Sequence, residues 1–366
     1  MIQHLHQCTD LNETTILCIA LNLNEHRNIL PVLNYYIKLF DGNIVYVLEK
    51  KLFSRINKIE YKDRVLIEHM NLDRIKLYFV ETIFDFSTIS NLRSIFLASS
   101  SLPSKLCQMN VAFKSITTIA ISHGLLSRHK NCPGQEWLLE KLNTSFHVFC
   151  ESNYSYQVYK EFGWDMANIK IVGMPVFQIA KEMSIEASKN PLVYPVPQNK
   201  EILNILYLVQ DYPPANQIRN LQMLKNLVSK HDKWRLTIRL HPVMSFTLGV
   251  LKAWIKENTH QISISDPCLQ DSLEAIQAHD VIVSHWSTGL LEAAIMKKIY
   301  IPLMSDIEEN FLDFPTICTT TKDVELLIEN SLCASPLFSN ANSLNHWFGN
   351  LENSIQILAN KIQNLS

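Results

Sequence analysis

The stretch DVIVSHWSTGLLEAAIMKKIYIPLM, residues 280–304, decides the fold class of this chain. An apolar run at 281–283 leads into small and polar residues, a helical pattern follows, and a second apolar run occupies 299–303. Two short apolar runs on either side of a helix are typical of parallel β-strands joined by a crossover helix. The stretch therefore predicts a βαβ unit whose first strand ends beside the polar residues 284–289.

The same alternation extends along most of the chain. Other apolar runs predict strands at 15–21, 44–48, 65–67, 76–80, 94–98, 117–121, 146–150 and 170–172, and then at 202–209, 234–240 and 262–265. Helical spacing predicts helices at 28–39, 215–229, 248–257, 271–277, 289–296, 323–330 and 343–363. We therefore predict an α/β protein of two Rossmann-like domains whose parallel sheets face a central cleft.

The segment NPLVYPVPQNK, residues 190–200, separates the two series of strands and holds three of the fourteen prolines. Proline-rich, polar stretches are common between domains. We predict an N-terminal domain at 1–178, a linker at 179–200 and a C-terminal domain at 201–342. The last helix, within 343–366, is expected to pack back on the N-terminal domain.

The composition of the 366 residues argues against several classes of protein. A formal net charge of −2 gives no basic field for a nucleic acid partner. No apolar run is long enough to span a membrane and no signal-type N-terminus is visible, so we expect a soluble, cytoplasmic protein. The eight glycines form no GxGxxG or GxxxxGK[ST] motif, which disfavours NAD enzymes and P-loop kinases. The eight cysteines form no CxxC pair, and without a clustered Asp pair we expect neither a metal nor a cofactor.

His241-Pro242 directly follows the predicted strand 234–240. Ligands of open α/β sheets bind at the carboxyl ends of the strands, where an imidazole can donate to a phosphate oxygen. Arg239 lies two residues earlier and is expected on the same side of the strand as His241. A His-Pro pair also ends strands that bind nothing, so for these three residues the functional and the structural interpretation both stay open.

The quoted stretch carries the pattern SxxSTGxxE, formed by Ser284, Ser287, Thr288, Gly289 and Glu292. Free backbone N–H groups at a helix start suit a phosphate, together with a Ser or Thr hydroxyl, and a glycine lets the ligand approach the backbone. The Glu in the first turn could accept from ribose hydroxyls. Ordinary helix capping explains the same residue types, so both interpretations stay open here too.

Two further strand ends carry candidates in the first domain. Ser122-His123-Gly124 follows the strand predicted at 117–121, and His123 is a candidate general base because an unperturbed imidazole titrates at about pH 6.5. Gly173, in the Gly-Met-Pro turn after 170–172, could line the cleft. The alternatives are a turn with a solvent-facing histidine and a plain exit turn.

At this point the motifs resemble those of GT-B glycosyltransferases. The string CESNYSYQVYKEFGWDMANIKIVGMP, residues 150–175, is similar to the segment of that superfamily in which a late strand leads into a helix and then a GxP turn. HG, GxP, HP and SxxSTGxxE in this order resemble bacterial sialyltransferases, capsule Kdo transferases and CDP-glycerol glycerophosphotransferases. The resemblance implies a cytidine-nucleotide donor in the C-terminal domain, held through its phosphate by His241, Ser287 and Thr288. It also implies an acceptor on the N-terminal domain, with His123 as the base.

The resemblance thus implies a metal-independent enzyme that moves a sugar from a CMP-activated donor to a surface-glycan acceptor. Sialic acid is the first expectation for the sugar and Kdo the second; a lipid-linked acceptor would bring the enzyme to the inner face of a membrane. One departure concerns the base, because the acidic D/E-D/E-G motif of sialyltransferases is matched only by Phe40-Asp41-Gly42, in a predicted helix-to-strand turn. Either His123 takes that role or the sugar is not sialic acid. A polyol-phosphate transferase of the CDP-glycerol type and a non-catalytic nucleotide-sugar-binding protein are the alternatives.

Overall fold

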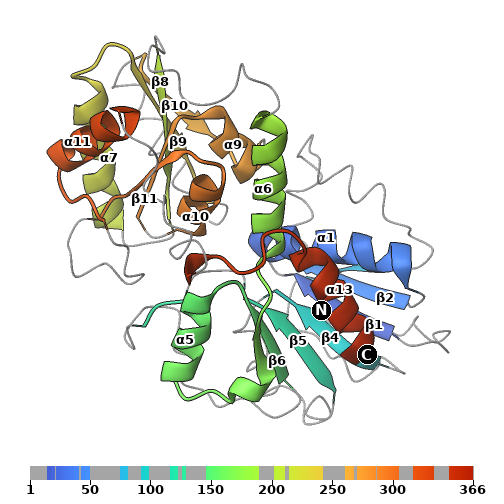
Figure 1. Ribbon diagram of the computed structural model, residues 1–366. Helices are drawn as coiled ribbons and strands as arrows, with labels where there is room; N and C mark the ends of the chain where they lie inside the picture. The colour runs from blue at the N-terminus through green and yellow to red at the C-terminus, as the bar shows by residue number, and fades with distance from the viewer. Residues whose placement is uncertain are drawn as a thin grey trace. The chain divides into compact units, whose positions relative to one another are not determined.

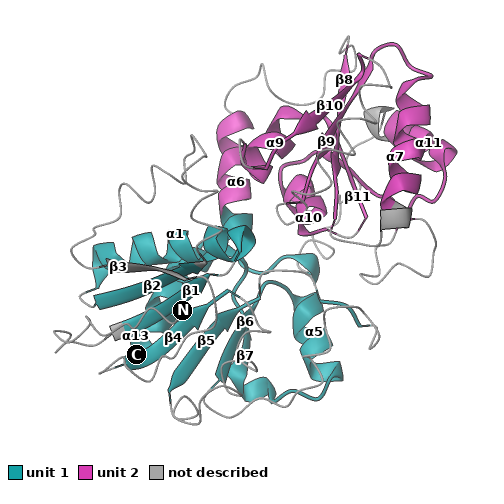
Figure 2. Cartoon of the chain, turned by 180° about the vertical axis from the view of Figure 1, so that it is seen from behind, with its two compact units in different colours: residues 1–178, 344–366 teal, residues 179–343 magenta. Residues whose placement is uncertain are grey.

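The chain divides into two compact units (Figure 2). Unit 1 comprises residues 1–178 and 344–366, and unit 2 comprises residues 179–343. The computed structural model describes residues 15–20, 22–40, 43–49, 75–80, 92–98, 116–122, 126–128, 146–188, 202–210, 214–241, 260–267, 270–285, 287–304, 316–333 and 346–365. Each unit is an α/β structure built on a parallel sheet.

In the described part of unit 1 the sheet has seven parallel strands, in the order β3-β2-β1-β4-β5-β6-β7 (Figure 2). They are β1 (Thr15–Ala20), β2 (Asn43–Glu49), β3 (Ile75–Val80), β4 (Leu92–Leu97), β5 (Thr117–Ile121), β6 (Phe146–Cys150) and β7 (Ile169–Ile171). The strand order reverses between β1 and β4, which is the topological switch point of a doubly wound sheet.

The helices of unit 1 come from both ends of the chain. They are α1 (Leu23–Leu39), α5 (Asn153–Glu161), the short 3₁₀ helix η4 (Met166–Asn168), the first turn of α6 (Pro175–Ser188) and α13 (Ser354–Leu365). Asn22 caps α1 by accepting from the backbone N–H of Glu25 at 3.0 Å. The C-terminal helix α13 packs against α1, where the Tyr36 hydroxyl donates to Oε1 of Gln363 at 2.7 Å.

In the described part of unit 2 the sheet has five parallel strands, in the order β10-β9-β8-β11-β12. They are β8 (Leu203–Leu208), β9 (Trp234–Arg239), β10 (Ile262–Ser265), β11 (Val281–Ser284) and β12 (Ile299–Pro302). Here the order reverses between β8 and β11, whose last residues, Leu208 and Ser284, are partners in register. The two strands of the switch point therefore end at the same edge.

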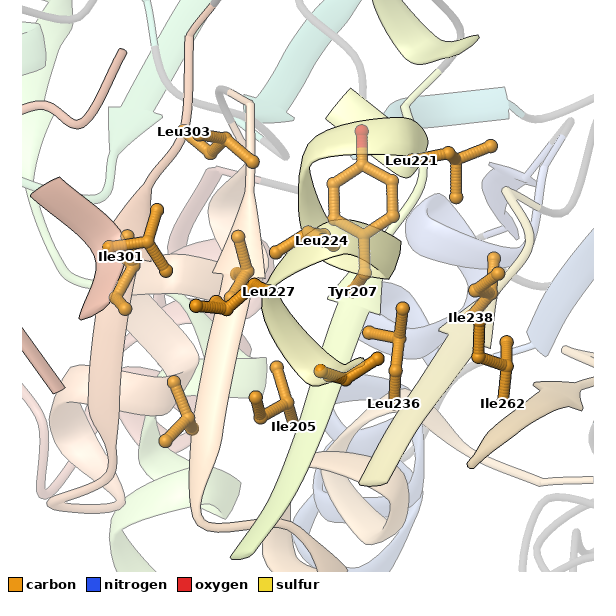
Figure 3. Packing of buried hydrophobic residues seen from close by; sticks show 14 of the residues in the cluster. Ile205, Tyr207, Leu221, Leu224, Leu227, Leu236, Ile238, Ile262, Ile301 and Leu303 are labelled. Carbon is orange, nitrogen blue, oxygen red and sulfur yellow. The ribbon is translucent and has the colours of Figure 1, made fainter. Parts of the chain in front are cut away.

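Helices cover both faces of the unit 2 sheet (Figures 1 and 2). One face carries α7 (Pro214–Val228) and α11 (Thr321–Cys333), and the other carries α9 (Ser272–Ala278) and α10 (Thr288–Ile295). Leu224 and Leu227 of α7 pack on the buried strand residues Ile205, Tyr207 and Ile238 (Figure 3). This continuous apolar layer explains why the strands read as nearly unbroken apolar runs.

The predicted fold class, two parallel-sheet α/β domains of Rossmann type, is confirmed. The predicted linker 179–200 is different, because α6 continues through Ser188. Pro175 begins this helix with a backbone angle that suits the first helical position, and Phe177 and Ala180 are fully buried. The predicted C-terminal helix also starts later, at Ser354, after a turn in which Asn350 Oδ1 accepts two backbone N–H groups at 2.8 Å. The strand predicted at 65–67 and the helix at 248–257 lie outside the described residues.

Candidate functional site

The candidate site of unit 2 is the edge where β8 and β11 end and α10 begins. Ser284 is fully buried there, and its hydroxyl donates to the backbone oxygen of Leu208 at 2.8 Å. The side chain predicted to contact a donor nucleotide therefore ties the two switch-point strands together. Ser284 therefore stabilises this edge from a buried position.

The start of α10 has the geometry of a capped helix N-terminus. Ser287 is the N-cap residue in extended conformation, and its Oγ accepts from the backbone N–H of Gly289 at 3.0 Å. Thr288 is half-buried, and Gly289 is buried against the Leu208 side chain. The capping interpretation of Ser287 is thus correct, and it leaves the positive end of α10 at the switch point, a position suited to an anion.

Glu292 is the fifth residue of α10, one position further along than predicted, because the helix begins at Thr288 and not at Gly289. Its side chain is 4% exposed. Glu292 is therefore a buried residue of α10, and its ribose contact stays a prediction.

Arg239, the last residue of β9, is also buried, at 5% exposure. Its Nη1 donates to Oγ of Ser265 at 2.9 Å, and its Nη2 donates to the backbone oxygen of Gln270 at 2.6 Å. The guanidinium thus links the end of β9 to the end of β10, and its contact with a donor stays a prediction. Its positive charge nevertheless lies at the carboxyl edge of the sheet. His241 is half-buried two residues after β9, and Pro242 lies outside the described residues.

His285, which sequence reasoning did not select, directly follows β11 and is 3% exposed. It stands between the strand-linking Ser284 and the N-cap Ser287. Its position directly after a predicted strand could have marked it as a candidate. The apolar pattern, however, does not indicate that an imidazole at this position is buried.

In unit 1 the candidate residues follow β5, whose neighbour in the sheet is β6. Ser122 is buried, and its backbone N–H donates to the oxygen of Phe149 at 3.1 Å. His123, the predicted base, and Gly124 lie outside the described residues. The assignment of His123 stays a prediction.

Glu151, which the sequence did not single out, is a fully buried carboxyl directly after β6. Its Oε1 accepts from the Ser155 hydroxyl, while no described residue forms a hydrogen bond with Oε2. Burial raises the pKa of Glu151 to about 7, against the opposing effect of hydrogen bonds from Ser155 and Ser122. This is an acid that can hold a proton near neutral pH, beside the strand end that precedes His123.

Gly173 serves packing within unit 1. Its φ of +91° lies in the left-handed region, and an added Cβ would lie 2.9 Å from the backbone nitrogen of Asn350 and closer still to its oxygen. The neighbouring Gly349 donates its backbone N–H to the oxygen of Glu151 at 2.6 Å. Gly173 is therefore in close contact with the returning C-terminal segment, and its place beside a cleft stays a prediction.

Among the described residues, no group of three or more His, Cys, Asp or Glu side chains is arranged to hold a metal ion. None of the described helices is both long and apolar enough to cross a membrane.

Comparison with known proteins gives structural matches alone. No protein-family model matches the sequence, and a search of curated proteins finds no match. The UDP-GlcNAc 2-epimerase of Methanocaldococcus jannaschii, in complex with UDP-GlcNAc and UDP, aligns with a TM-score of 0.66 at 14% identity, over 96% of this chain and 100% of its own. The UDP-GlcNAc 2-epimerase of Neisseria meningitidis, bound to UDP-GlcNAc, gives 0.65 at 13% identity, over 96% and 100%. The wall teichoic acid polymerase TagF gives 0.59 at 14% identity, over 95% and 88%.

The fold is of the GT-B type. Identities of 13% to 14% in these matches establish a shared architecture and leave the reaction open.

Proposed function

We propose that this chain is a glycosyltransferase that moves a sugar from a CMP-activated donor to a glycan acceptor, with unit 2 binding the nucleotide. The supporting observation is the edge of unit 2, where the start of α10 lies at the switch point between β8 and β11. Nucleotides bind at such points in doubly wound sheets, with phosphate at a helix N-terminus. The buried guanidinium of Arg239 adds positive charge to the same edge.

In this proposal the bond between the anomeric carbon and the phosphate oxygen of the donor breaks, and CMP leaves with the electron pair. The hydroxyl oxygen of the acceptor forms the new bond, and its proton passes to a base of unit 1, for which His123 is our assignment. His241 and the N–H groups at the start of α10 stabilise the charge that develops on the departing phosphate. Sialic acid is our first choice of sugar.

A polyol-phosphate transferase is the second candidate, and the similarity to the wall teichoic acid polymerase TagF favours it. In that reaction the bond between the two phosphoryl groups of a CDP-polyol breaks, and the polyol phosphate moves to the acceptor. CMP is again the leaving group. Nucleotide binding alone therefore cannot separate the two candidates, and the donor must be varied.

Two measurements test the proposal in sequence. Thermal unfolding with CMP, CDP, UDP or GDP should show the largest rise in Tm with CMP, because a ligand that binds only the folded state stabilises it by mass action. Incubation with CMP-sialic acid or CDP-glycerol and a glycan acceptor should then release CMP from only one donor. A rise in Tm with UDP alone would contradict the CMP assignment, and would favour chemistry of the kind named for the two epimerases.

Replacing His241 tests the donor edge. His241→Ala should lower CMP release at least about a hundredfold, the scale of losing one donor of an electrostatic site, with the Tm unchanged. The matched control is His231→Ala, since His231 is a half-buried residue whose Nε2 lies 2.7 Å from Oε1 of Glu325. Near-full activity of His241→Ala would overturn the donor-site assignment.

A further inference from the structure

A cluster of buried polar side chains lies at the carboxyl end of strand β6 in unit 1. Glu151, Ser152 and Ser155 are fully buried, and Ser122, which directly follows β5, is buried as well. Glutamate is almost never fully buried in proteins unless a cation pairs with it. Apolar packing therefore does not explain why a carboxyl occupies this strand end.

Three parts of unit 1 hold Glu151 in place. Its Oε1 accepts from the hydroxyl of Ser155 in α5, and the side chain of Ser122 forms a second hydrogen bond with the carboxyl from the end of β5. The backbone oxygen of Glu151 accepts from the N–H of Gly349, in the returning C-terminal segment, at 2.6 Å. The carboxyl is therefore fixed beside the point where β5 ends.

The partners of this carboxyl among the described residues are hydroxyls and not cations. Burial raises the pKa of Glu151 to about 7, and the hydrogen bonds from Ser155 and Ser122 oppose this effect. Of the described groups that interact with Glu151, Cys150 is the one that titrates, and burial together with the charge of Glu151 raises the pKa of its thiol. Near neutral pH the charge of the cluster is thus set by Glu151 alone.

The candidate base of unit 1 is close to Glu151 along the chain of bonds. His123 directly follows Ser122 in the sequence, and the Ser122 side chain is bonded to the Glu151 carboxyl. Glu151 is therefore one hydrogen bond and one peptide bond away from the backbone of His123. A charge in a buried position acts strongly over such a separation, because little water screens it.

We propose that Glu151 is a positioning residue whose carboxyl, fixed by Ser155 and Ser122, places a negative charge near His123 and favours the protonated imidazole. The catalytic part of this inference rests on the proposed function, in which His123 takes the proton of the acceptor hydroxyl. A nearby carboxylate stabilises the imidazolium that forms in that step. Glu151 itself is fully buried and acts through the base, not on the acceptor.

A purely structural role of Glu151 predicts a different result. If Glu151 only joins β5 to α5 by hydrogen bonds, Glu151→Gln keeps an oxygen for Ser155 and leaves the titration of His123 unchanged. If its charge acts on His123, the same variant lowers the pKa of the imidazole, since an opposite charge has been removed. The pKa of His123 therefore separates the two roles.

The test is NMR of the histidine side chains of the full chain between pH 5 and 9, without any substrate. The variant His123→Gln assigns the signal of His123. We expect Glu151→Gln to lower the pKa of His123 by about half a pH unit or more. Glu161→Gln is the matched control, because it removes the same charge from the exposed end of α5 and should leave this pKa unchanged. If Glu151→Gln does not fold, Ser155→Ala replaces it: losing this hydroxyl raises the pKa of Glu151, and the pKa of His123 should fall.

The pH dependence of kcat/KM for CMP release connects the titration to catalysis. In Glu151→Gln the acidic limb of this profile should move to lower pH by the same amount, whereas a structural loss would lower the rate equally at every pH. An unchanged pKa of His123 in Glu151→Gln would overturn the inference, even if the transferase reaction is observed. A lowered pKa would support the inference even if no donor releases CMP, since that failure would contradict the proposed function alone.

Discussion

The carboxyl edges of the two sheets carry similar residues, but these residues have different surroundings. In unit 2 a glycine and two serines surround the start of α10, and Ser287 and Gly289 form a cap whose positive end lies at the switch point. In unit 1 backbone atoms of Asn350 occupy the space that a side chain at Gly173 would need. The buried Glu151 lies nearby. A glycine near a strand end thus lies at a helix start in one sheet and at a chain crossing in the other. The two glycines differ in what surrounds them: the Leu208 side chain lies against Gly289, and the Asn350 backbone lies against Gly173.

The largest expected effect comes from filling the glycine of unit 1. Gly173→Ala should lower the free energy of unfolding by about 4 kcal/mol or more, since the new methyl group meets backbone atoms of Asn350 at a positive φ. Gly163→Ala is the control, with a φ of +79° and nothing within 4 Å of an added Cβ. It should cost only about 1 kcal/mol. Equal losses in urea unfolding would mean that Gly173 is needed for its backbone angle alone.

Glu151→Gln is expected to change how stability depends on pH. The pKa of Glu151 is raised from 4.5 to about 7 in the folded chain, so its contribution is complete below about pH 4.5 and is lost as the pH rises to 7. Glutamine cannot ionise and keeps an oxygen for the Ser155 hydroxyl. The difference in unfolding free energy between variant and wild type should therefore shift in favour of the variant by about 3 kcal/mol across this window.

Denaturant unfolding at several pH values between 4 and 8 measures this shift. Glu329→Gln, at an exposed glutamate of α11, is the control and should run parallel to the wild type. If the plot of unfolding free energy against pH for Glu151→Gln ran parallel to that of the wild type, the pKa of Glu151 would be the same in the folded and unfolded chain.

Gly289→Ala should be milder than Gly173→Ala. The added methyl group meets the end of the flexible Leu208 side chain and lies 3.3 Å from Oγ of Ser287. We expect a loss of about 1 to 2 kcal/mol in stability, because a side chain can move where a backbone cannot. If α10 binds the donor phosphate, CMP should lose its effect on the Tm in this variant. A stability loss as large as that of Gly173→Ala would remove the distinction between the two edges.

The smallest change in stability compares the two helix caps. Ser287→Ala and Ser152→Ala should each cost about 1 kcal/mol, since each hydroxyl accepts one backbone N–H at a helix start. Only Ser287→Ala should weaken CMP binding, as measured by calorimetry. An equal loss of CMP affinity in both variants would argue against a nucleotide site at the edge of unit 2.

Most of the fold could be predicted from the sequence because buried parallel strands read as apolar runs. The strands at 117–121, 146–150 and 262–265 have the predicted bounds. Helix α6 was missed because the proline that begins it looks the same in a sequence as a proline that ends an element. The segment after the predicted turn was then assigned to a linker.

The site was less predictable because its partners are distant in the sequence. The hydroxyl of Ser284 and the guanidinium of Arg239 are bonded to Leu208 and Ser265, contacts that no local pattern reveals. Glu151 stands between Cys150 and Ser152 in a stretch that indicates a strand end, and nothing local shows that its carboxyl is buried. The cap at Ser287 was predictable since capping depends on neighbours in the chain.

The return of the C-terminal segment to unit 1 sets an order of events during synthesis. The bond between Tyr36 and Gln363 and the contact between Gly349 and Glu151 need residues made after all of unit 2, which spans 165 positions from 179 to 343. At about 5–20 residues per second, a ribosome needs roughly 10 to 30 s to cover that distance. Unit 1 is thus the first unit to leave the ribosome and the last to be completed. Until α13 has been synthesised, the apolar surface of unit 1 that this helix covers stays exposed to solvent.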